Sequence, residues 1–364
     1  MSIESELKRD GINVIEELDT LKVNAIAKSV AKKISDTIHL NGINEADLFI
    51  NLSRLNMYTA FLPDGISAKY FYKNNSIYFS VNTPDSALGD VAIHECIHYI
   101  QSKFDEKNNL LRLGLCDFYN SKSFDLCLNE AAVQSIASKC IDAQYEEVKY
   151  FGISLKTNSP SYYPLECALL SQMAYITGED VLIDSTINSN DRFKKSFISL
   201  TSEKVYNEIS KNINLIVAKE ERLDRLFYNL NRIEEDHKNI DKILSQIDKE
   251  KQKIRNIFMN TQNLIITSYF DNYINVVSTP KAIEIYRNRL YNFKNLLGIT
   301  DDYTFFNDYY LSKMEQLENK YQLKNSTITA LAIRKENFIS VLFRKLRTLF
   351  KVQKEYERSY NENR

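Results

Sequence analysis

Turn-forming residues are concentrated in the first half of this 364-residue chain. Seven of the eight glycines and four of the five prolines lie before residue 180. Because Gly and Pro are the residues that most often interrupt regular structure, the remainder is expected to form long helices, and the first half can hold strands and turns. The sequence therefore predicts an α+β fold, with a mixed domain over 1–200 that includes N-terminal helices, followed by an all-helical region over 201–364.

Three short runs rich in aromatic and β-branched residues follow one another between residues 56 and 82. They are NMYTAFL (56–62), SAKYFYK (67–73) and SIYFSVN (76–82), separated by Pro63-Asp64-Gly65 and by Asn74-Asn75. Such runs between turn signals are typical of strands joined by hairpins. We predict a small three-stranded antiparallel meander here, and no other convincing sheet.

Helical spacing of apolar residues surrounds this predicted sheet. Helices are expected over 23–38, 43–55, 124–142 and 164–177. Another should begin directly after the third strand, because Thr83-Pro84 supplies an N-cap residue and a proline at the first helical position. This helix contains the run SALGDVAIHECIHYIQSKF.

A heptad pattern runs from residue 223 to residue 258. One seam has Leu or Ile at five successive positions, while His237 and Lys251 interrupt the other: Leu226, Ile233, Ile240, Ile247 and Ile254. We predict one long helix whose apolar stripe packs against another helix, in the same chain or in a second copy. Folding back of the helices that follow Thr279 is preferred over self-association. Further helices are expected from Asp301-Asp302 and from about residue 325 to the end.

The predicted helix after the sheet contains the motif His94-Glu95-Cys96-Ile97-His98, which is HExxH. Histidines at positions i and i+4 lie on one face of a helix, where their imidazoles can converge on one metal ion. The glutamate beside them can reach a water molecule at that ion. Imidazole and carboxylate ligands favour zinc, and no thiolate is placed to assist. Two histidines packed in a core beside a solvated glutamate are the alternative.

A zinc site of this kind needs a third protein ligand. His39 precedes the sheet and His237 lies in the heptad seam, so neither is a good candidate. Glu130, in the segment LNEAA, stands near the start of an Ala-rich helix, where small neighbours allow close approach to another helix. The alternative is a first-turn glutamate that only interacts with the helix dipole.

The motif HECIH after a short antiparallel sheet, with NEAA on a following helix, resembles the gluzincin branch of zinc metallopeptidases. The resemblance covers roughly residues 20–200. It implies a zincin-like domain with an active-site helix, zinc bound by His94, His98 and Glu130, and Glu95 as the general base. Many gluzincins have an acidic residue after the third ligand that orients a histidine, and here only Gln134 could substitute for it. In such proteases an edge strand, here 76–82, holds the substrate extended.

A second electrophile usually stabilises the oxyanion in this chemistry. Tyr163, or its neighbour Tyr162, is the candidate, because both precede the helix over 164–177. With 23 tyrosines in the chain, packing is the alternative role for either residue.

Composition bears on partners and location. Lys plus Arg total 47 against 48 Asp plus Glu, which gives a net charge of −1 and no overall positive field for nucleic acid. Five cysteines without CxxC spacing suggest reduced core thiols. The start of the sequence has no leader pattern, and no run of about 18 apolar residues occurs, so a cytoplasmic location is expected. The basic segment 342–354 is expected to form an ordinary helix with a solvated basic face, and contact with a membrane surface or an acidic partner is the alternative.

These features predict a zinc-dependent metallopeptidase that hydrolyses a protein or peptide. The alternative is a helical interaction or regulatory protein with a catalytically idle zincin-like domain, whose working surface is the heptad region 223–258. A secreted protease exported without a classical leader is a third hypothesis.

Overall fold

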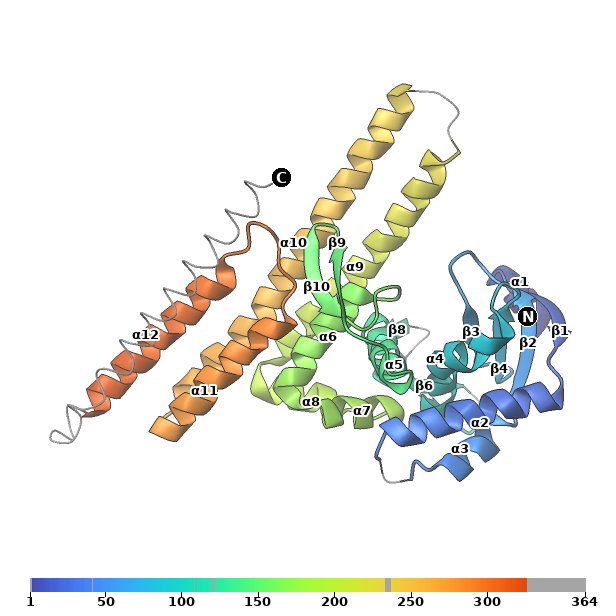
Figure 1. Cartoon of the computed structure of the whole chain (residues 1–364), viewed down its shortest axis with the longest axis horizontal. Helices are drawn as coiled ribbons and strands as arrows, with labels where there is room; N and C mark the ends of the chain where they lie inside the picture. The colour runs from blue at the N-terminus through green and yellow to red at the C-terminus, as the bar shows by residue number, and fades with distance from the viewer. Residues whose placement is uncertain (1, 41, 108, 120–121, 233–236, 326–364) are drawn as a thin grey trace. The chain divides into compact units, whose positions relative to one another are not determined.

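The protein is a mixed α+β chain in which helices predominate (Figure 1). The computed structural model describes residues 2–40, 42–107, 109–119, 122–232 and 237–325. Contacts divide the chain into two compact units, Met1–Phe305 and Phe306–Arg364. The predicted division after residue 200 stays a prediction. The described part of the second unit is helix α12 (Phe305–Asn325).

The first unit has eleven of the described α-helices, and those predicted in its first 180 residues are confirmed. They are α1 (Ile3–Arg9), α2 (Thr20–Thr37), α3 (Glu45–Leu52), α4 (Leu88–Gln101), α5 (Leu126–Cys140), α6 (Pro164–Thr177), α7 (Glu179–Ile187), α8 (Arg192–Leu200), α9 (Glu203–Leu230), α10 (His237–Val276) and α11 (Pro280–Phe293). Short 3-10 turns, η1 (Asp85–Ala87) and η2 (Lys294–Leu296), precede α4 and follow α11.

The first sheet is mixed rather than an antiparallel meander. Its strands are β1 (Asn13–Glu17), β2 (Asn56–Phe61), β3 (Ala68–Phe71) and β4 (Ser76–Ser80), in the order β1-β2-β4-β3. The predicted hairpin over 68–82 is confirmed as β3 and β4, but β4 also pairs in parallel with β2. The meander was wrong because β4 is buried on both faces and needs neighbours on both sides.

Two further sheets were missed by the sequence prediction. One has the order β5-β6-β7-β8, from β5 (Ser102–Phe104), β6 (Leu110–Leu113), β7 (Cys116–Tyr119) and β8 (Lys122–Phe124). The other pairs β9 (Glu146–Tyr150) with β10 (Ile153–Thr157). The strands are short and, apart from β10, mostly half-exposed, so most of them carry little of the apolar alternation that identifies a strand. Strand β10 does alternate, with Ile153, Leu155 and Thr157 buried, and this signal was missed.

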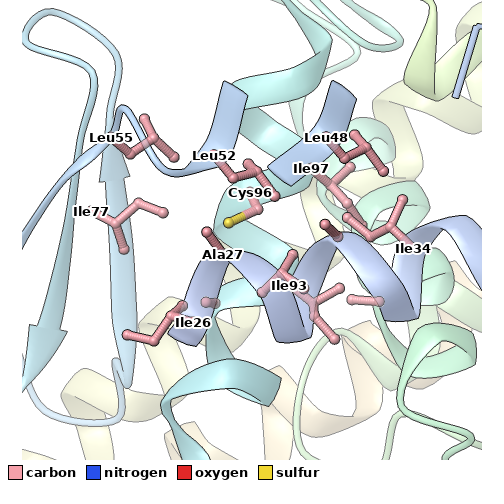
Figure 2. Close-up of a cluster of buried hydrophobic side chains, with 14 of the residues drawn as sticks. Ile26, Ala27, Ile34, Leu48, Leu52, Leu55, Ile77, Ile93, Cys96 and Ile97 are labelled. Carbon is pink, nitrogen blue, oxygen red and sulfur yellow. The ribbon is translucent and has the colours of Figure 1, made fainter. Parts of the chain in front are cut away.

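The main core of this region lies between α2, α3, α4 and the first sheet (Figure 2). Ile26 and Ile34 of α2 meet Ile93 and Ile97 of α4, and Ile77 of β4 closes one side. Each of these side chains is nearly or fully buried. This packing fixes the face of α4 that points away from solvent, so the opposite part of α4 is left to present its histidines toward α5.

The heptad region forms two helices, not one. Helix α9 ends at Leu230 and α10 begins at His237, and the two pack against each other as a helical hairpin (Figure 1). Of the five seam positions, Leu226, Ile247 and Ile254 are buried, Ile240 is half-buried and Ile233 lies outside the described residues. The stripe is therefore covered within the chain, mainly by α9 rather than by the helices after Thr279.

A buried aspartate joins the start of α5 to the helical hairpin. Asp125 has a left-handed backbone (φ +63°) and is 7% exposed. Its carboxylate accepts hydrogen bonds from the hydroxyl groups of Tyr206 and Ser210 on α9, and Lys194 of α8 lies 3.3 Å from it. Two hydroxyls and one ammonium group satisfy the buried charge, so α5 is held against α8 and α9.

Three remaining expectations concern the chain as a whole. All five cysteines are free thiols, as predicted. Among the described residues, no helix is both long enough and apolar enough to cross a membrane. The basic segment 342–354 lies outside the described residues.

Candidate metal centre

Helix α4 places the HExxH motif as the sequence predicts. The chain leaves β4, passes Pro84 and the turn η1, and enters α4 at Leu88. His94 and His98 stand one turn apart, with ring centroids 4.8 Å apart and Nε2 atoms 3.0 Å apart. Their side chains are 18% and 8% exposed, so both rings lie at the floor of a partly covered site.

Helix α5 brings the third predicted ligand to these histidines. Glu130 Oε2 lies 3.4 Å from His94 Nε2 and 3.4 Å from His98 Nε2. Close approach of the helices is possible because Ala131 and Ala132 beside it have no exposed surface and little bulk. Within the described part of the chain, these three residues are the one group of His, Cys, Asp and Glu side chains whose ligand atoms converge and could hold a metal ion.

The spacing of the three ligand atoms fits a tetrahedral ion. In a regular tetrahedron two ligand atoms are about 1.63 times the metal–ligand distance apart, so zinc bonds of about 2.0–2.1 Å require about 3.3–3.4 Å. The two distances to Glu130 are 3.4 Å, and the distance between the two imidazole nitrogens is 3.0 Å. Two of the three edges therefore match, and the third needs a small outward rotation of one ring.

Both histidines have a glutamine at the ring nitrogen that faces away from the triad. Gln134 Oε1 lies 3.0 Å from His94 Nδ1, and the same amide donates to Ser138 Oγ, which fixes its oxygen toward the ring. Gln134 therefore occupies the position from which an acidic residue would orient the ring of His94. The sequence analysis missed Gln101, whose amide nitrogen Nε2 lies 2.7 Å from His98 Nδ1.

The buried amide of Gln101 also favours a metal-binding tautomer of His98. Its Oε1 atom is buried without a hydrogen-bond partner. Oxygen and nitrogen of an amide are assigned from the hydrogen-bond network, and rotating this amide would direct Oε1 to His98 Nδ1. Nδ1 would then carry the proton, and the Nε2 lone pair would face Glu130, as metal ligation requires.

Gly114 allows this outer layer to pack closely. A Cβ atom at this position would collide with the side-chain oxygens of Gln101 and Asn129, and its φ of +57° also favours glycine. Asn129, the residue before Glu130, is fully buried and accepts a hydrogen bond from Leu115 N. The turn after β6 therefore supports both metal-site helices at once.

The charges at this site shift the pKa values of Glu130 and His94. Burial would raise the pKa of Glu130, yet the charge of His98 and hydrogen bonds from both histidines hold it far below its ordinary value. Burial would lower the pKa of His94, but its hydrogen bond to Glu130 and the charges of Glu95 and Glu130 raise it overall. The carboxylate is thus ionised, as a metal ligand must be.

Glu95 points to the first sheet. Its Oε2 atom accepts a hydrogen bond of 2.6 Å from the backbone N–H of Tyr70 in β3. Strand β3 is at the edge of the sheet, whereas β4, which the sequence analysis took as the edge strand beside the site, lies between β2 and β3. The strand with a free edge near Glu95 is therefore β3.

The two candidate tyrosines occupy different positions. Tyr162 is 44% exposed, and its hydroxyl lies 3.1 Å from Ser67 Oγ, just before β3. Tyr163 is the residue before α6, in a left-handed conformation with φ +53°. Burial, followed by the charges of Glu130 and Cys127, raises the pKa of Tyr163 well above its ordinary value. Tyr163 is therefore a neutral hydroxyl within range of the charge of Glu130.

An acidic pocket of about 370 Å³ shares Tyr163 with this site. Aromatic residues of the β9–β10 turn, the segment before α6 and one face of α9 form its wall, which is lined by Tyr150, Phe151, Ser161, Tyr162, Tyr163, Pro164, Val217, Glu220, Glu221, Leu223, Asp224 and Phe227. The wall thus has three acidic residues and no Lys, Arg or His. Sequence reasoning did not find this pocket, because its α9 face lies more than fifty residues along the chain from the other lining segments.

The lining residue Glu220 interacts with a second glutamate, Glu166, which does not line the pocket. Glu166 of α6 has no exposed surface, and neither of its carboxylate oxygens has a hydrogen-bond partner of good geometry. Burial raises the pKa of Glu166 to about 7. Burial, together with the charge of Glu166 and then of Asp224, raises the pKa of Glu220 to about 9.

This pair predicts a pH-dependent stability. The folded protein holds a proton on Glu166 up to about pH 7 and on Glu220 up to about pH 9, whereas the unfolded chain loses both protons near pH 4.5. The free energy of unfolding should therefore fall as pH rises, by up to about 1.4 kcal/mol per pH unit for each proton held. Tyr150, Tyr163 and Cys127 are other titratable groups around the pair, and burial raises the pKa of each, so none of them loses its proton over this range.

Urea denaturation at pH 5, 6, 7 and 8 measures this slope. The variant Glu166→Gln cannot ionise and should give a flatter profile with a higher stability at pH 8. An unchanged slope in that variant would contradict the assignment.

Comparison of the chain with protein-family models, curated proteins and solved structures finds no match.

Proposed function

We propose that this protein is a zinc-dependent metallopeptidase that hydrolyses peptide bonds of a protein or peptide. The observation that supports it most is the convergence of His94, His98 and Glu130, whose ligand atoms are 3.0–3.4 Å apart. Imidazole and carboxylate donors of this number and spacing suit a catalytic zinc site, which takes three protein ligands and leaves one position open. The HExxH motif adds a carboxylate that is not a ligand.

The residues around the triad have separate roles in this proposal. Glu95 lies next to His94 on α4 and would take a proton from the attacking water and later give it to the leaving amine. Its bond to Tyr70 N keeps the carboxylate at the edge of β3. Tyr163, a neutral hydroxyl near Glu130 and Glu95, would donate to the developing oxyanion.

The edge strand β3 would hold the substrate. A strand with an unpaired side offers N–H and C=O groups to an extended peptide. Strand β3 pairs with β4 on one side, and the N–H of Tyr70 on its other side reaches Glu95. A peptide aligned along β3 would therefore bring a carbonyl group near Glu95 and the triad.

A bound zinc ion would supply Lewis-acid polarisation and would lower the pKa of a water molecule at its open position. The protein's contribution is to hold three ligands in place, with Gln134 and Gln101 fixing the two imidazole rings.

Metal analysis and peptide hydrolysis test this proposal together. Protein purified without added zinc should contain about one zinc per chain, and a mixture of unstructured peptides should yield new amino termini that a chelator abolishes. Metal without hydrolysis would favour the alternative of a catalytically idle domain with an interaction role. Absence of both would contradict the proposal.

Replacement of Gln134 by Ala should weaken zinc binding about 10- to 100-fold, because His94 would lose the partner that fixes its ring. Competition with a fluorescent zinc chelator measures the affinity. Gln144→Ala, at an exposed position beyond α5, is the matched control and should bind zinc as the unmodified protein does. Equal affinities in the two variants would show that Gln134 does not orient His94.

A further inference from the structure

The pocket beside Tyr163 combines aromatic walls with negative charge. Five of its lining residues are aromatic, from three separate segments: Tyr150, Phe151, Tyr162, Tyr163 and Phe227. Three acidic residues come from one stretch of α9. Glu221 and Asp224 are carboxylates that provide the negative charge, whereas burial raises the pKa of Glu220 to about 9, so this residue is protonated at neutral pH. A volume of 370 Å³ is at the lower end of the range of about 300–1,000 Å³ found for ligand pockets.

Two basic residues of α9 next to the lining carboxylates are engaged with helix α10, whereas Lys251 of α10 lies over the ring of the lining residue Phe227, with its Nζ 5.6 Å from the ring centroid. Lys219 Nζ and Arg222 Nε lie 3.1 Å and 3.6 Å from Glu250 of α10. These two side chains are therefore engaged with the helix α10, and neither lines the pocket. Glu221 and Asp224 are exposed at its mouth.

A buried glutamate next to the pocket lacks a hydrogen-bond partner of good geometry. Glu166, fully buried and without a hydrogen-bond partner of good geometry, interacts with the lining residue Glu220. A buried polar group of this kind normally has a partner in a native structure. A donor that enters the pocket would hydrogen-bond to Glu220, which interacts with Glu166.

A small inorganic cation is not the ligand that this arrangement fits. The pocket carboxylates are not among the groups of described residues whose ligand atoms converge within reach of one ion. Aromatic rings around separated carboxylates instead suit an ammonium or guanidinium group on an apolar stem. The cation lies over the rings, and several acceptors receive its N–H bonds.

Helix α6 connects the pocket to the candidate metal site. Tyr163 lines the pocket and is within range of the charges of Glu130 and Glu95, and Cys167, one turn further along α6, donates a hydrogen bond to the carbonyl of Ala131 beside Glu130. Cys127 lies one turn before Glu130 on α5. Burial, together with the charges of Glu166, Glu130 and Glu221, raises its pKa to about 11. A substrate lying across the triad can therefore reach the pocket with a neighbouring residue.

We propose that this pocket binds a cationic group of the substrate, so that the enzyme selects peptides with a lysine or arginine side chain, or a free amino terminus, close to the cleaved bond. The inference depends on the proposed peptidase function for its place in catalysis. Cation binding itself does not depend on turnover.

Two sets of peptides test the inference. In the first, one position at a time carries Lys, Arg or the neutral norleucine, and in the second the amino terminus is either free or acetylated. We expect kcat/KM to be about 10- to 100-fold higher for the cationic member of one set, as a hydrogen-bonded charge in a partly buried site provides. The set that shows the preference identifies the source of the cation.

The double variant Glu221→Gln/Asp224→Asn should lose most of this preference, because kcat/KM for the cationic peptide should fall to near the value for the neutral peptide. Glu208→Gln, at an exposed position of the same helix outside the pocket, removes a charge of the same kind and should keep the preference. Loss of the preference in both variants would mean that general charge, not the pocket, provides the selectivity, and would overturn the inference.

Binding to the Glu95→Gln protein separates this inference from the proposed function. Calorimetry with the same peptides should show the same preference in Kd without hydrolysis. If the unmodified protein cleaves cationic and neutral peptides equally well, the inference fails and the peptidase function stands. If nothing is cleaved but cationic peptides still bind through Glu221 and Asp224, the function fails and the pocket assignment stands. Neither cleavage nor preferential binding would overturn the inference.

Discussion

Peptide hydrolysis should fall by about 10²- to 10⁴-fold in the variant Glu95→Gln, while the metal content stays unchanged. The amide has nearly the same shape as the carboxylate but cannot accept a proton from water. Because Glu95 lies beside the triad and is not one of its members, the three ligand atoms keep their positions. Initial rates on a fluorogenic peptide, together with metal analysis of the same samples, measure both quantities.

Glu208→Gln is the matched control for this variant. It changes the same residue type at an exposed position on α9 and should retain full activity. Loss of metal from the Glu95→Gln protein would indicate that the carboxylate holds the ion or the fold, and not the proton. Full activity in that variant would remove Glu95 from the mechanism.

Replacement of Glu130 by Gln should cause the largest loss of zinc affinity, well beyond the roughly 10- to 100-fold expected for a residue outside the ligand set. Glu130 supplies the one anionic ligand, and its Oε2 atom lies 3.4 Å from both imidazole nitrogens. A neutral amide at this position leaves two histidines, which is fewer ligands than zinc sites normally have.

The thermal unfolding of this variant provides a second measurement. Zinc should raise the melting temperature of the unmodified protein, since a ligand at 100 times its Kd adds about 2.7 kcal/mol to stability. The Glu130→Gln protein should not respond to the same concentration. An equal response would place the metal elsewhere in the chain.

The metal triad could be found from sequence because its parts are local signals. The HExxH spacing places two histidines on one helical face, and Glu130 stands out as a carboxylate between small residues. Gln101, three residues after His98, is also local, and the extended pattern HExxHxxQ could have identified it. The roles of Asn129 and Gly114 could not be predicted, because they arise from the packing of a turn against two helices.

The positions of β2, β3 and β4 were predictable, but the order in which they pair was not. The sequence of β4 (SIYFS) contains consecutive apolar residues, which is typical of an internal strand, whereas an edge strand usually alternates. This signal could have placed β4 at the centre of the sheet. The pairing of β2 with β4 still depends on where the β3 hairpin inserts, which no local pattern contains.

The heptad pattern misled for a related reason. It records which residues are buried, and both α9 and α10 bury the predicted positions. A repeat cannot report that the chain reverses direction when the apolar spacing continues on both sides of the turn. Asn229 and Asn231, at the last turn of α9 and its C-cap, were the available sign of a helix end.

The carboxylate of Asp125 gives the metal-site helix a mechanical connection to the helical hairpin. Asp125 lies at the start of α5, five residues before Glu130, and accepts hydrogen bonds from two residues of α9. A partner that shifted α9 along its axis would therefore alter the position of Glu130, and zinc would resist that shift. By thermodynamic reciprocity, whatever factor the metal adds to the affinity of such a partner, the partner adds to the affinity of the metal.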